Sequence, residues 1–206
     1  MTKFYLQNSE AKLGTRMTWW GHGNYTTDLD AAKIFTQEEA VGHHQEREAF
    51  IPWPADFVYP KAHSAVDCQY VREQDLTILP SDTPCYVQLM SRWDGNDLYW
   101  ETADGGFNAN LDRAQVITLA EAFTRYGTVD RANSRTIWPK AYIDGKARKV
   151  AHQLEMNITD ALVGTEIALI QRPVNKPRHT CSDCGRFLSK FQFWHSCPNC
   201  SASIRP

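Results

Sequence analysis

Thr36-Gln37-Glu38-Glu39-Ala40 recurs later in the chain as Thr118-Leu119-Ala120-Glu121-Ala122. In a Thr-x-x-Glu sequence the threonine hydroxyl accepts a hydrogen bond from the glutamate amide, and the glutamate carboxylate accepts one from the threonine amide. Both stretches therefore predict the start of a short helix. The repetition of this helix start indicates a duplicated unit.

Four more pairs of similar blocks surround the two helix starts in the same order and at a nearly constant offset. They are Tyr5-Leu6-Gln7 with Tyr86-Val87-Gln88, Trp19-Trp20 with Tyr99-Trp100, residues 25–32 with 107–114, and residues 53–58 with 138–143. The first two blocks of each set predict a hairpin of two strands. The Trp-Pro dipeptides predict short extended segments that continue through Val58 and Ile143, because the residue before proline is biased away from helix.

The fold class expected from these patterns is α+β, with two strand-rich repeats that each contain one short helix and are followed by a small zinc ribbon. The expected boundaries are residues 1–84, 85–170 and 171–206. A unit of about 80 residues buries only a small core. We expect the two repeats to pack side by side, in a pseudo-twofold or a tandem arrangement.

Four of the six cysteines form two CxxC pairs, Cys181-Ser-Asp-Cys184 and Cys197-Pro-Asn-Cys200, separated by twelve residues. Each CxxC turn can direct two thiolates to one side, and two such turns supply the four soft ligands of a tetrahedral Zn²⁺ ion. Disulfides or a redox-active pair are the alternatives, but a chain without an export signal rarely forms disulfides, and redox CxxC pairs normally occur singly.

The C-terminal segment resembles a zinc ribbon. Because all four expected ligands are thiolates, one structural Zn²⁺ is expected rather than a catalytic one. A segment shorter than about 40 residues has too small a core to fold without the metal.

Composition excludes several classes of protein. With 42% hydrophobic residues and a net charge of −2, the chain is neither a disordered protein nor a polyanion-coating protein. No apolar stretch reaches the roughly 18 residues of a membrane span, and residues 1–10 lack the apolar core of a signal peptide. We expect a cytoplasmic protein with no membrane partner.

Enzyme signatures are missing from the sequence: it has no glycine-rich phosphate loop, no His-Glu-x-x-His and no Gly-x-Ser-x-Gly. A non-enzymatic protein with no catalytic residues is therefore expected, and an enzyme with an unrecognised pocket is the less favoured alternative. His43 and His44 lie near the end of the first predicted helix, where histidine is electrostatically favourable, and are expected to be solvated.

The aromatic pair Trp19-Trp20, the segment Asn24-Tyr25-Thr26-Thr27-Asp28-Leu29 and the helix start at Thr36 form a recognisable module. This module resembles small uncharacterised proteins encoded by bacteriophages and prophages, and here it is duplicated. Asn24 replaces the glycine found in that pattern, and the second copy departs further. The resemblance covers roughly residues 4–155 and implies a phage protein acting in the bacterial host cytoplasm.

Two partner classes follow from the distribution of charge. Residues 171–206 carry six basic side chains and one acidic side chain, which gives +5, so residues 1–170 carry −7. The favoured function is a protein that binds and inhibits a host complex, such as a defence or transcription system, through exposed aromatic side chains. The alternative is nucleic-acid binding by the basic, aromatic ribbon. The candidate partner-binding residues are Trp93, Arg186, Lys190, Phe191, Phe193 and Trp194.

Overall fold

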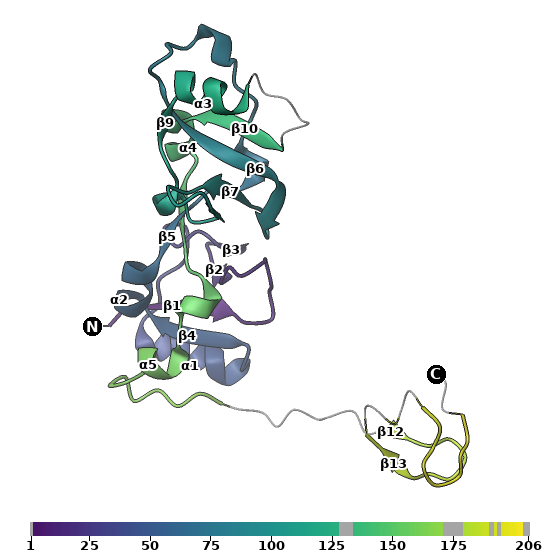
Figure 1. The fold of residues 1–206 in the computed structure, drawn as a ribbon. Coiled ribbons are helices and arrows are strands. Elements are labelled where there is room, and N and C mark those ends of the chain that lie inside the picture. Colours follow the sequence, from purple (N-terminus) through teal and green to yellow (C-terminus); the bar gives the residue numbers. More distant parts are fainter. Residues whose placement is uncertain (1, 128–133, 171–178, 190–191, 193–194, 204–206) are drawn as a thin grey trace. The chain divides into compact units, whose positions relative to one another are not determined.

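The computed structural model describes residues 2–127, 134–170, 179–189, 192 and 195–203. The chain consists of two compact units, unit 1 (residues 1–170) and unit 2 (residues 171–206). Helices and antiparallel sheets both contribute to unit 1 (Figure 1), which confirms the predicted α+β class. Below, residues 1–83 are called the first half of unit 1 and residues 84–170, which begin with β6, the second half.

The first half contains an antiparallel sheet with the strand order β3-β2-β1-β4. Its strands are β1 (Phe4–Asn8), β2 (Trp19–Trp20), β3 (Tyr25–Thr26) and β4 (Phe50–Pro54). The second half contains a sheet with the order β10-β6-β7-β8, in which β9 also pairs with β6. Its strands are β6 (Pro84–Asp94), β7 (Asp97–Glu101), β8 (Phe107–Asn108), β9 (Ile117–Thr118) and β10 (Arg135–Pro139).

One helix of two or more turns follows the hairpin in each half: α1 (Gln37–Glu46) and α3 (Leu119–Tyr126). Both begin with the predicted reciprocal cap. The Glu39 amide donates to the Thr36 hydroxyl while the Thr36 amide donates to the Glu39 carboxylate, and Thr118 and Glu121 make the same pair of bonds. The two helix starts are thus confirmed.

The expectation for the Trp-Pro segments was wrong. In both halves the strand ends at the proline, and a short helix begins directly after it: α2 (Ala55–Val58) and α4 (Lys140–Asp144). Pro54 and Pro139 have φ of −57° at the N-caps of these helices. Proline restricts the residue before it, but its own fixed φ suits the entry to a helix. Each half therefore contains more than the one predicted helix.

Short 3₁₀ segments complete unit 1. They are η1 (Tyr59–Lys61), η2 (Cys68–Tyr70), η3 (Leu76–Ile78), η4 (Leu111–Arg113) and η6 (Gln153–Glu155).

The central strands β1 and β6 are packed on both faces of their sheets. On one face of β1, Phe4 and Leu6 share a buried cluster with Ala40 of α1. On the other face, Tyr5 shares a cluster with Trp19. Strand β6 repeats this arrangement, with Cys85 and Val87 packed against Leu119 and Ala122 of α3 on one face and Tyr86 packed near Trp100 on the other. Each helix therefore covers only one face of its sheet.

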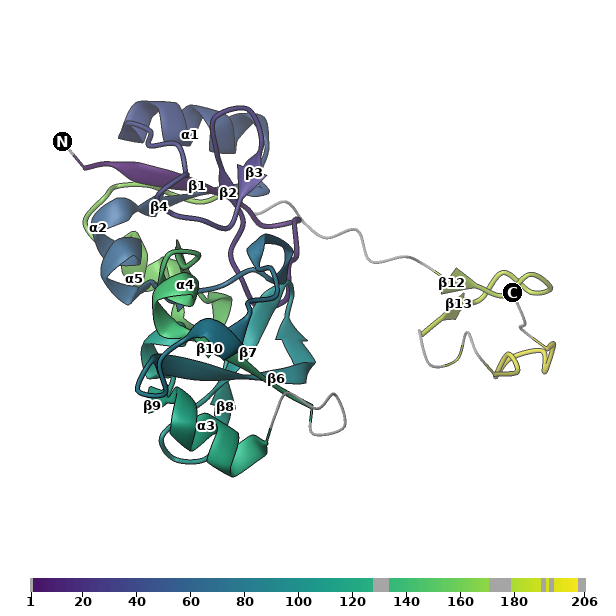
Figure 2. The same ribbon diagram turned by 90° about the horizontal axis from the view of Figure 1, so that it is seen from above.

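The second face of each sheet is covered by a segment from the other half, which we call an exchanged segment. The exchanged segments are residues 63–71, with β5 (His63–Ala65), and residues 148–161, with β11 (Arg148–Val150) and α5 (Ile158–Ala161). Val66 lies in the cluster of Trp100, and Ala151 lies in the cluster of Trp19. Figure 2 shows the exchange by colour, since green α5 lies beside blue α2.

Backbone hydrogen bonds fix the exchange in both directions. The Leu98 amide donates to the Val66 carbonyl, and the Met17 amide donates to the Ala151 carbonyl, each at 3.0 Å. Strands β5 and β11 pair antiparallel with each other. Each fully buried aliphatic or aromatic side chain contributes roughly 1.5–3 kcal/mol. Neither half can bury its own core fully without the other half.

The sheets correct the sequence alignment by one residue. Trp19 is paired with Gln7 in the first sheet, and Trp100 is paired with Gln88 in the second. Trp19, and not Trp20, therefore stands where Trp100 stands. Both are fully buried, whereas Trp20 is only partly buried.

In unit 2, the described strands are β12 (His179–Thr180) and β13 (Phe187–Leu188), which pair antiparallel. The buried cluster of this unit is small and consists of Cys181, Leu188 and Cys197, with Ala202 packed against it. Within the part of the chain that the structure describes, no helix is long and apolar enough to cross a membrane.

Candidate metal centre and the polar pockets of unit 1

The four cysteines of the two CxxC pairs come together in unit 2. Their Sγ atoms all lie within 4.8 Å of one another. Cys181 Sγ is 3.6 Å from Cys200 Sγ, and Cys184 Sγ is 3.6 Å from Cys197 Sγ. These separations are far longer than the roughly 2.05 Å of a disulfide. They are close to the roughly 3.8 Å expected between sulfurs bound tetrahedrally at about 2.3 Å from one ion. The cluster can hold a metal ion.

Two similar turns position these thiols. In the first turn the Gly185 amide donates to the Cys181 carbonyl at 2.9 Å, and in the second the Ser201 amide donates to the Cys197 carbonyl at 2.8 Å. Both turns end in a left-handed residue, with φ of 71° at Gly185 and 58° at Ser201. One cysteine of each turn, Cys181 and Cys197, is buried. The chain therefore closes around the thiols from two sides.

Backbone amides favour the thiolate form of two of these cysteines. The Arg186 amide is the main cause that lowers the pKa of the Cys184 thiol to about 6. The Asn199 amide, 3.5 Å from Cys197 Sγ, is the main cause that lowers the pKa of the Cys197 thiol. Thiolates are the form in which cysteine binds metal ions.

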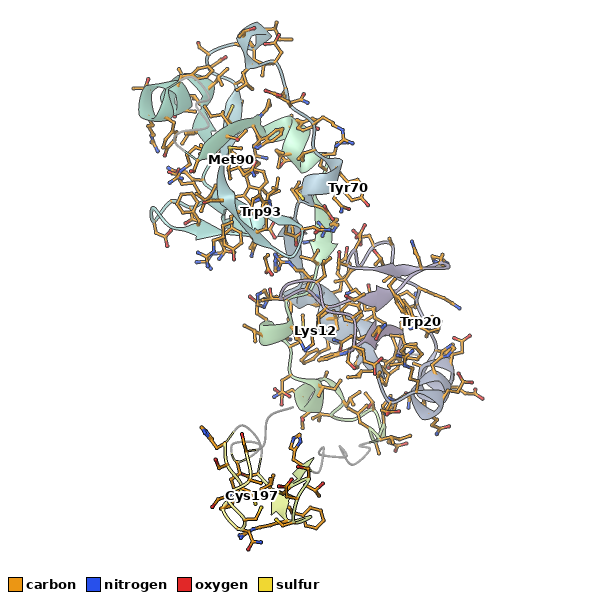
Figure 3. The ribbon with its side chains drawn as sticks, turned by 90° about the vertical axis from the view of Figure 1, so that its right-hand side faces the viewer. Lys12, Trp20, Tyr70, Met90, Trp93 and Cys197 are labelled. Atoms are coloured by element: carbon orange, nitrogen blue, oxygen red, sulfur yellow. The ribbon has the colours of Figure 1, made fainter. Side chains whose placement is uncertain are left out.

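The candidate partner-binding residues are only partly described. Arg186 is exposed in unit 2, and Trp93 on β6 is 50% exposed in unit 1 (Figure 3). Lys190, Phe191, Phe193 and Trp194 lie outside the described residues. Phe187, which was not among the predicted partner-binding residues, is 66% exposed next to Arg186.

His44 was expected to be solvated but is buried. Its Nδ1 lies 2.9 Å from the Phe50 carbonyl, and its Nε2 accepts a hydrogen bond from the Ile170 amide at 2.8 Å. The imidazole connects α1 to the end of unit 1, so its role is structural. The pairing of a helix end with residue 170 leaves no local signal in the sequence.

A buried ionic network, also missed, lies where the two halves of unit 1 meet. Asp97 is fully buried and accepts hydrogen bonds from Arg16 Nε and from Arg148 Nη2, each at 2.6 Å. Arg16 also lies 3.6 Å from Asp94, and its Nη1 is 2.9 Å from His63 Nε2. Arg16 and Asp97 are separated in the sequence by the same interval as Gln7 and Gln88. An alignment of the two halves with this constant offset therefore assigns Arg16 and Asp97 to corresponding positions.

Tight turns bring these charges together. Gly14 and Gly95 have φ of 60° and 63°, and the space where a Cβ at Gly14 would stand is already occupied by Asp94 and Gly95. The Thr15 amide donates to Asp94 Oδ1 at 2.7 Å across this contact. Glycine is required at position 14 both for its backbone conformation and for the close approach of the two chain segments.

Two polar pockets flank the network, with volumes of about 710 Å³ and about 270 Å³. They are lined by corresponding positions of the two halves. The pairs, with the larger pocket first, include Ala11 and Arg92, Thr18 and Tyr99, Ala31 and Arg113, and Asp67 and His152. The fold thus places corresponding positions around two pockets that differ in volume and in chemistry.

No protein-family model, curated protein or solved structure matches this chain.

Proposed function

We propose that this chain is a non-enzymatic accessory protein of the bacteriophage type that binds, and thereby inhibits, a host protein complex such as a defence or transcription system. We further propose that one structural Zn²⁺ ion, held by Cys181, Cys184, Cys197 and Cys200, folds unit 2. Zinc is supported by the set of four thiol ligands, which suits a tetrahedral, borderline-soft ion. A closed set of four thiolates leaves no coordination position for a substrate.

The test of the zinc assignment is the metal content of the purified chain. Wild type is expected to contain one zinc per chain. Cys181→Ser and Cys200→Ser are expected to lose it, and unit 2 is expected to lose its hydrogen-exchange protection while unit 1 keeps its own. Cys68→Ser is the matched control because Cys68 lies outside the cluster in unit 1. Full zinc content in both ligand variants would refute the assignment.

Partner binding is carried by one observation, the 50% exposure of Trp93. Tryptophan is enriched among the residues that dominate binding energies, and an exposed indole that a partner covers gives a large apolar contribution. The position of the first half that corresponds to Trp93 is Lys12, which is also exposed. The apolar ring at position 93 is therefore a property of this half and is not required by the turn that both halves share.

A capture experiment tests this surface. The full chain is immobilised and exposed to nuclease-treated bacterial lysate, and retained proteins are quantified by mass spectrometry. Wild type is expected to retain a stoichiometric protein complex, and Trp93→Lys, which installs the residue of the other half, is expected to retain at least tenfold less. Ile78→Ser is the control, since Ile78 is 78% exposed elsewhere in unit 1. Equal retention by wild type and Trp93→Lys would refute this role.

Nucleic-acid binding by unit 2 is the second candidate, and the adjacent exposure of Arg186 and Phe187 favours it. An exposed aromatic ring beside a cation suits base stacking on a single strand. The test is binding of a labelled oligonucleotide at increasing salt. A steep loss of affinity with salt, together with a loss in Phe187→Ser, would support this candidate, and salt-independent or absent binding would exclude it.

A further inference from the structure

The smaller of the two pockets of unit 1 is lined by two exposed arginines, Arg92 and Arg113. The Arg92 guanidinium lies 4.7 Å from the centre of the Tyr99 ring, and Arg113 is the last residue of η4. Among the residues that the structure describes, neither arginine forms an ion pair. At the corresponding positions the larger pocket has Ala11 and Ala31. The shared fold therefore does not require a guanidinium at either position.

The lining of this pocket also contains buried nitrogen donors that have no hydrogen-bond acceptor among the described residues. The Arg16 side chain is 1% exposed, and its Nη2, which lies 3.6 Å from Asp94 Oδ2, has no hydrogen-bond partner among the described residues. A guanidinium can only donate, so His63 Nε2, which faces Arg16 Nη1, must accept, and the ring proton is on Nδ1. His63 Nδ1 likewise lacks a partner within the described part of the chain. Burial and the charge of Arg16 lower the pKa of His63 to about 4, so the ring is a neutral donor at pH 7.

The acidic side chains of the pocket do not balance these donors. Asp94 is already used, because its carboxylate accepts the Thr15 amide and hydroxyl and lies 3.6 Å from Arg16. Glu155 is the remaining acid in the lining, and it is exposed. The pocket is thus rich in donors, with one carboxylate at its edge.

We propose that this pocket, lined by Arg92, Arg113, Arg16 and His63, is a binding site for a small oxyanion, of which a phosphate group is the best fit. Arginine presents a planar fork that matches two oxygens of a phosphate or carboxylate. The volume of about 270 Å³ is slightly below that of pockets for drug-sized molecules, so the ligand is a small ion or the phosphate group of a small ester. This proposal does not rest on the partner binding or on the metal centre proposed above.

Calorimetric titration of the zinc-loaded full chain tests the proposal, with inorganic phosphate, phenyl phosphate and acetate as probes at constant ionic strength. Saturable binding of one phosphate is expected. Tighter binding of phenyl phosphate than of inorganic phosphate would identify a phosphate ester as the natural ligand class, and the reverse would identify the free ion. Arg92→Ala and Arg113→Ala, which install the residues of the larger pocket, are each expected to weaken binding about tenfold or more, because hydrogen bonds to charged groups are strong.

Two further variants make the result specific. Glu155→Gln is expected to tighten phosphate binding severalfold, because it removes a negative charge from the lining of the pocket. Lys12→Ala, in the larger pocket, is expected to leave the affinity unchanged. Unchanged thermal unfolding of the arginine variants would show that they fold, as their exposure predicts. The proposal is overturned if no probe binds saturably to wild type, or if Lys12→Ala weakens binding as much as the arginine variants do.

Discussion

The two halves of unit 1 use the same scaffold residues and different residues where they meet. In each half a tryptophan of a neighbouring strand, β4 or β10, donates to a glutamine of the central strand: Trp53 Nε1 to Gln7 and Trp138 Nε1 to Gln88, both at 2.7 Å. At the junction, in contrast, corresponding positions hold opposite charges, Arg16 and Asp97. Two identical chains related by a twofold axis would place like charges there. A single chain with two halves can place a cation against an anion.

The exchanged segments make this difference energetically important. Because each half completes the core of the other, the junction is an interior and not a surface contact. A charge in an interior must be paired, since its desolvation otherwise costs several kcal/mol. Substitutions in the junction network are therefore expected to reduce the stability of unit 1 most strongly.

The largest effect is expected from Asp97→Asn. This change leaves Arg16 and Arg148 without the carboxylate that both donate to, in a fully buried position. The free energy of unfolding of unit 1 is expected to fall by about 3–5 kcal/mol, measured by urea denaturation followed by circular dichroism.

The control for that variant is the exposed pair of Lys140 and Asp144, whose side chains are 38% and 41% exposed. Asp144→Asn is expected to cost about 1 kcal/mol or less, because solvent screens an exposed pair. If Asp97→Asn and Asp144→Asn lower the free energy of unfolding equally, the junction network is screened by solvent and is not buried.

A somewhat smaller effect is expected from Gly14→Ala. The new Cβ would overlap Asp94 and the Gly95 backbone and would also need a φ of 60°. Overpacking and backbone strain together predict a loss of about 2–4 kcal/mol in the free energy of unfolding. Gly105→Ala separates the two causes, since Gly105 has a φ of 79° and open space around it, and should cost only about 1–2 kcal/mol. A cost at Gly14 no larger than at Gly105 would contradict the close approach of the two turns.

The pH dependence of stability distinguishes His63 from Arg148, which occupies the corresponding position of the second exchanged segment and does not titrate. Burial, and then the charge of Arg16, lower the pKa of His63 from 6.5 to about 4; Glu155 and Asp112 act in the opposite direction, and His152 in the same one. Below pH 6.5 the unfolded chain binds a proton that the folded chain binds only near pH 4. The free energy of unfolding should therefore fall as the pH is lowered through this window.

The expected loss between pH 6.5 and pH 5 is up to about 2 kcal/mol. Urea denaturation at both pH values measures it, and His63→Gln is the reference because it removes the titrating group. If the variant loses as much stability as wild type over this window, His63 is not the group responsible.

How far the sequence predicts this molecule depends on the range of each interaction. The caps at Thr36 and Thr118 could be predicted because the bonding partners lie only three residues apart. The clustering of the CxxC thiols could be predicted because two CxxC pairs at this spacing are typical of a metal site. The helices after Pro54 and Pro139 were missed because a rule for the residue before proline was applied to the residues after it. The exchanged segments were not predicted because Val66 and Ala151 are ordinary apolar residues. The local sequence around an apolar residue does not determine which of two cores its side chain will join.

The smallest effect is expected from the two helix caps, which the halves share. Thr36→Ala and Thr118→Ala each remove the hydroxyl that accepts from the glutamate amide at 3.2 Å. Loss of such a cap typically costs about 1 kcal/mol. Since both caps contain the same reciprocal pair of backbone-to-side-chain bonds, the two costs are expected to agree within about 0.5 kcal/mol in urea denaturation. The two sites lie in different halves, so the costs are expected to add in the double variant. If the double variant loses much more free energy of unfolding than the sum of the single variants, the two helices are coupled through the junction. Each half would then stabilise the other.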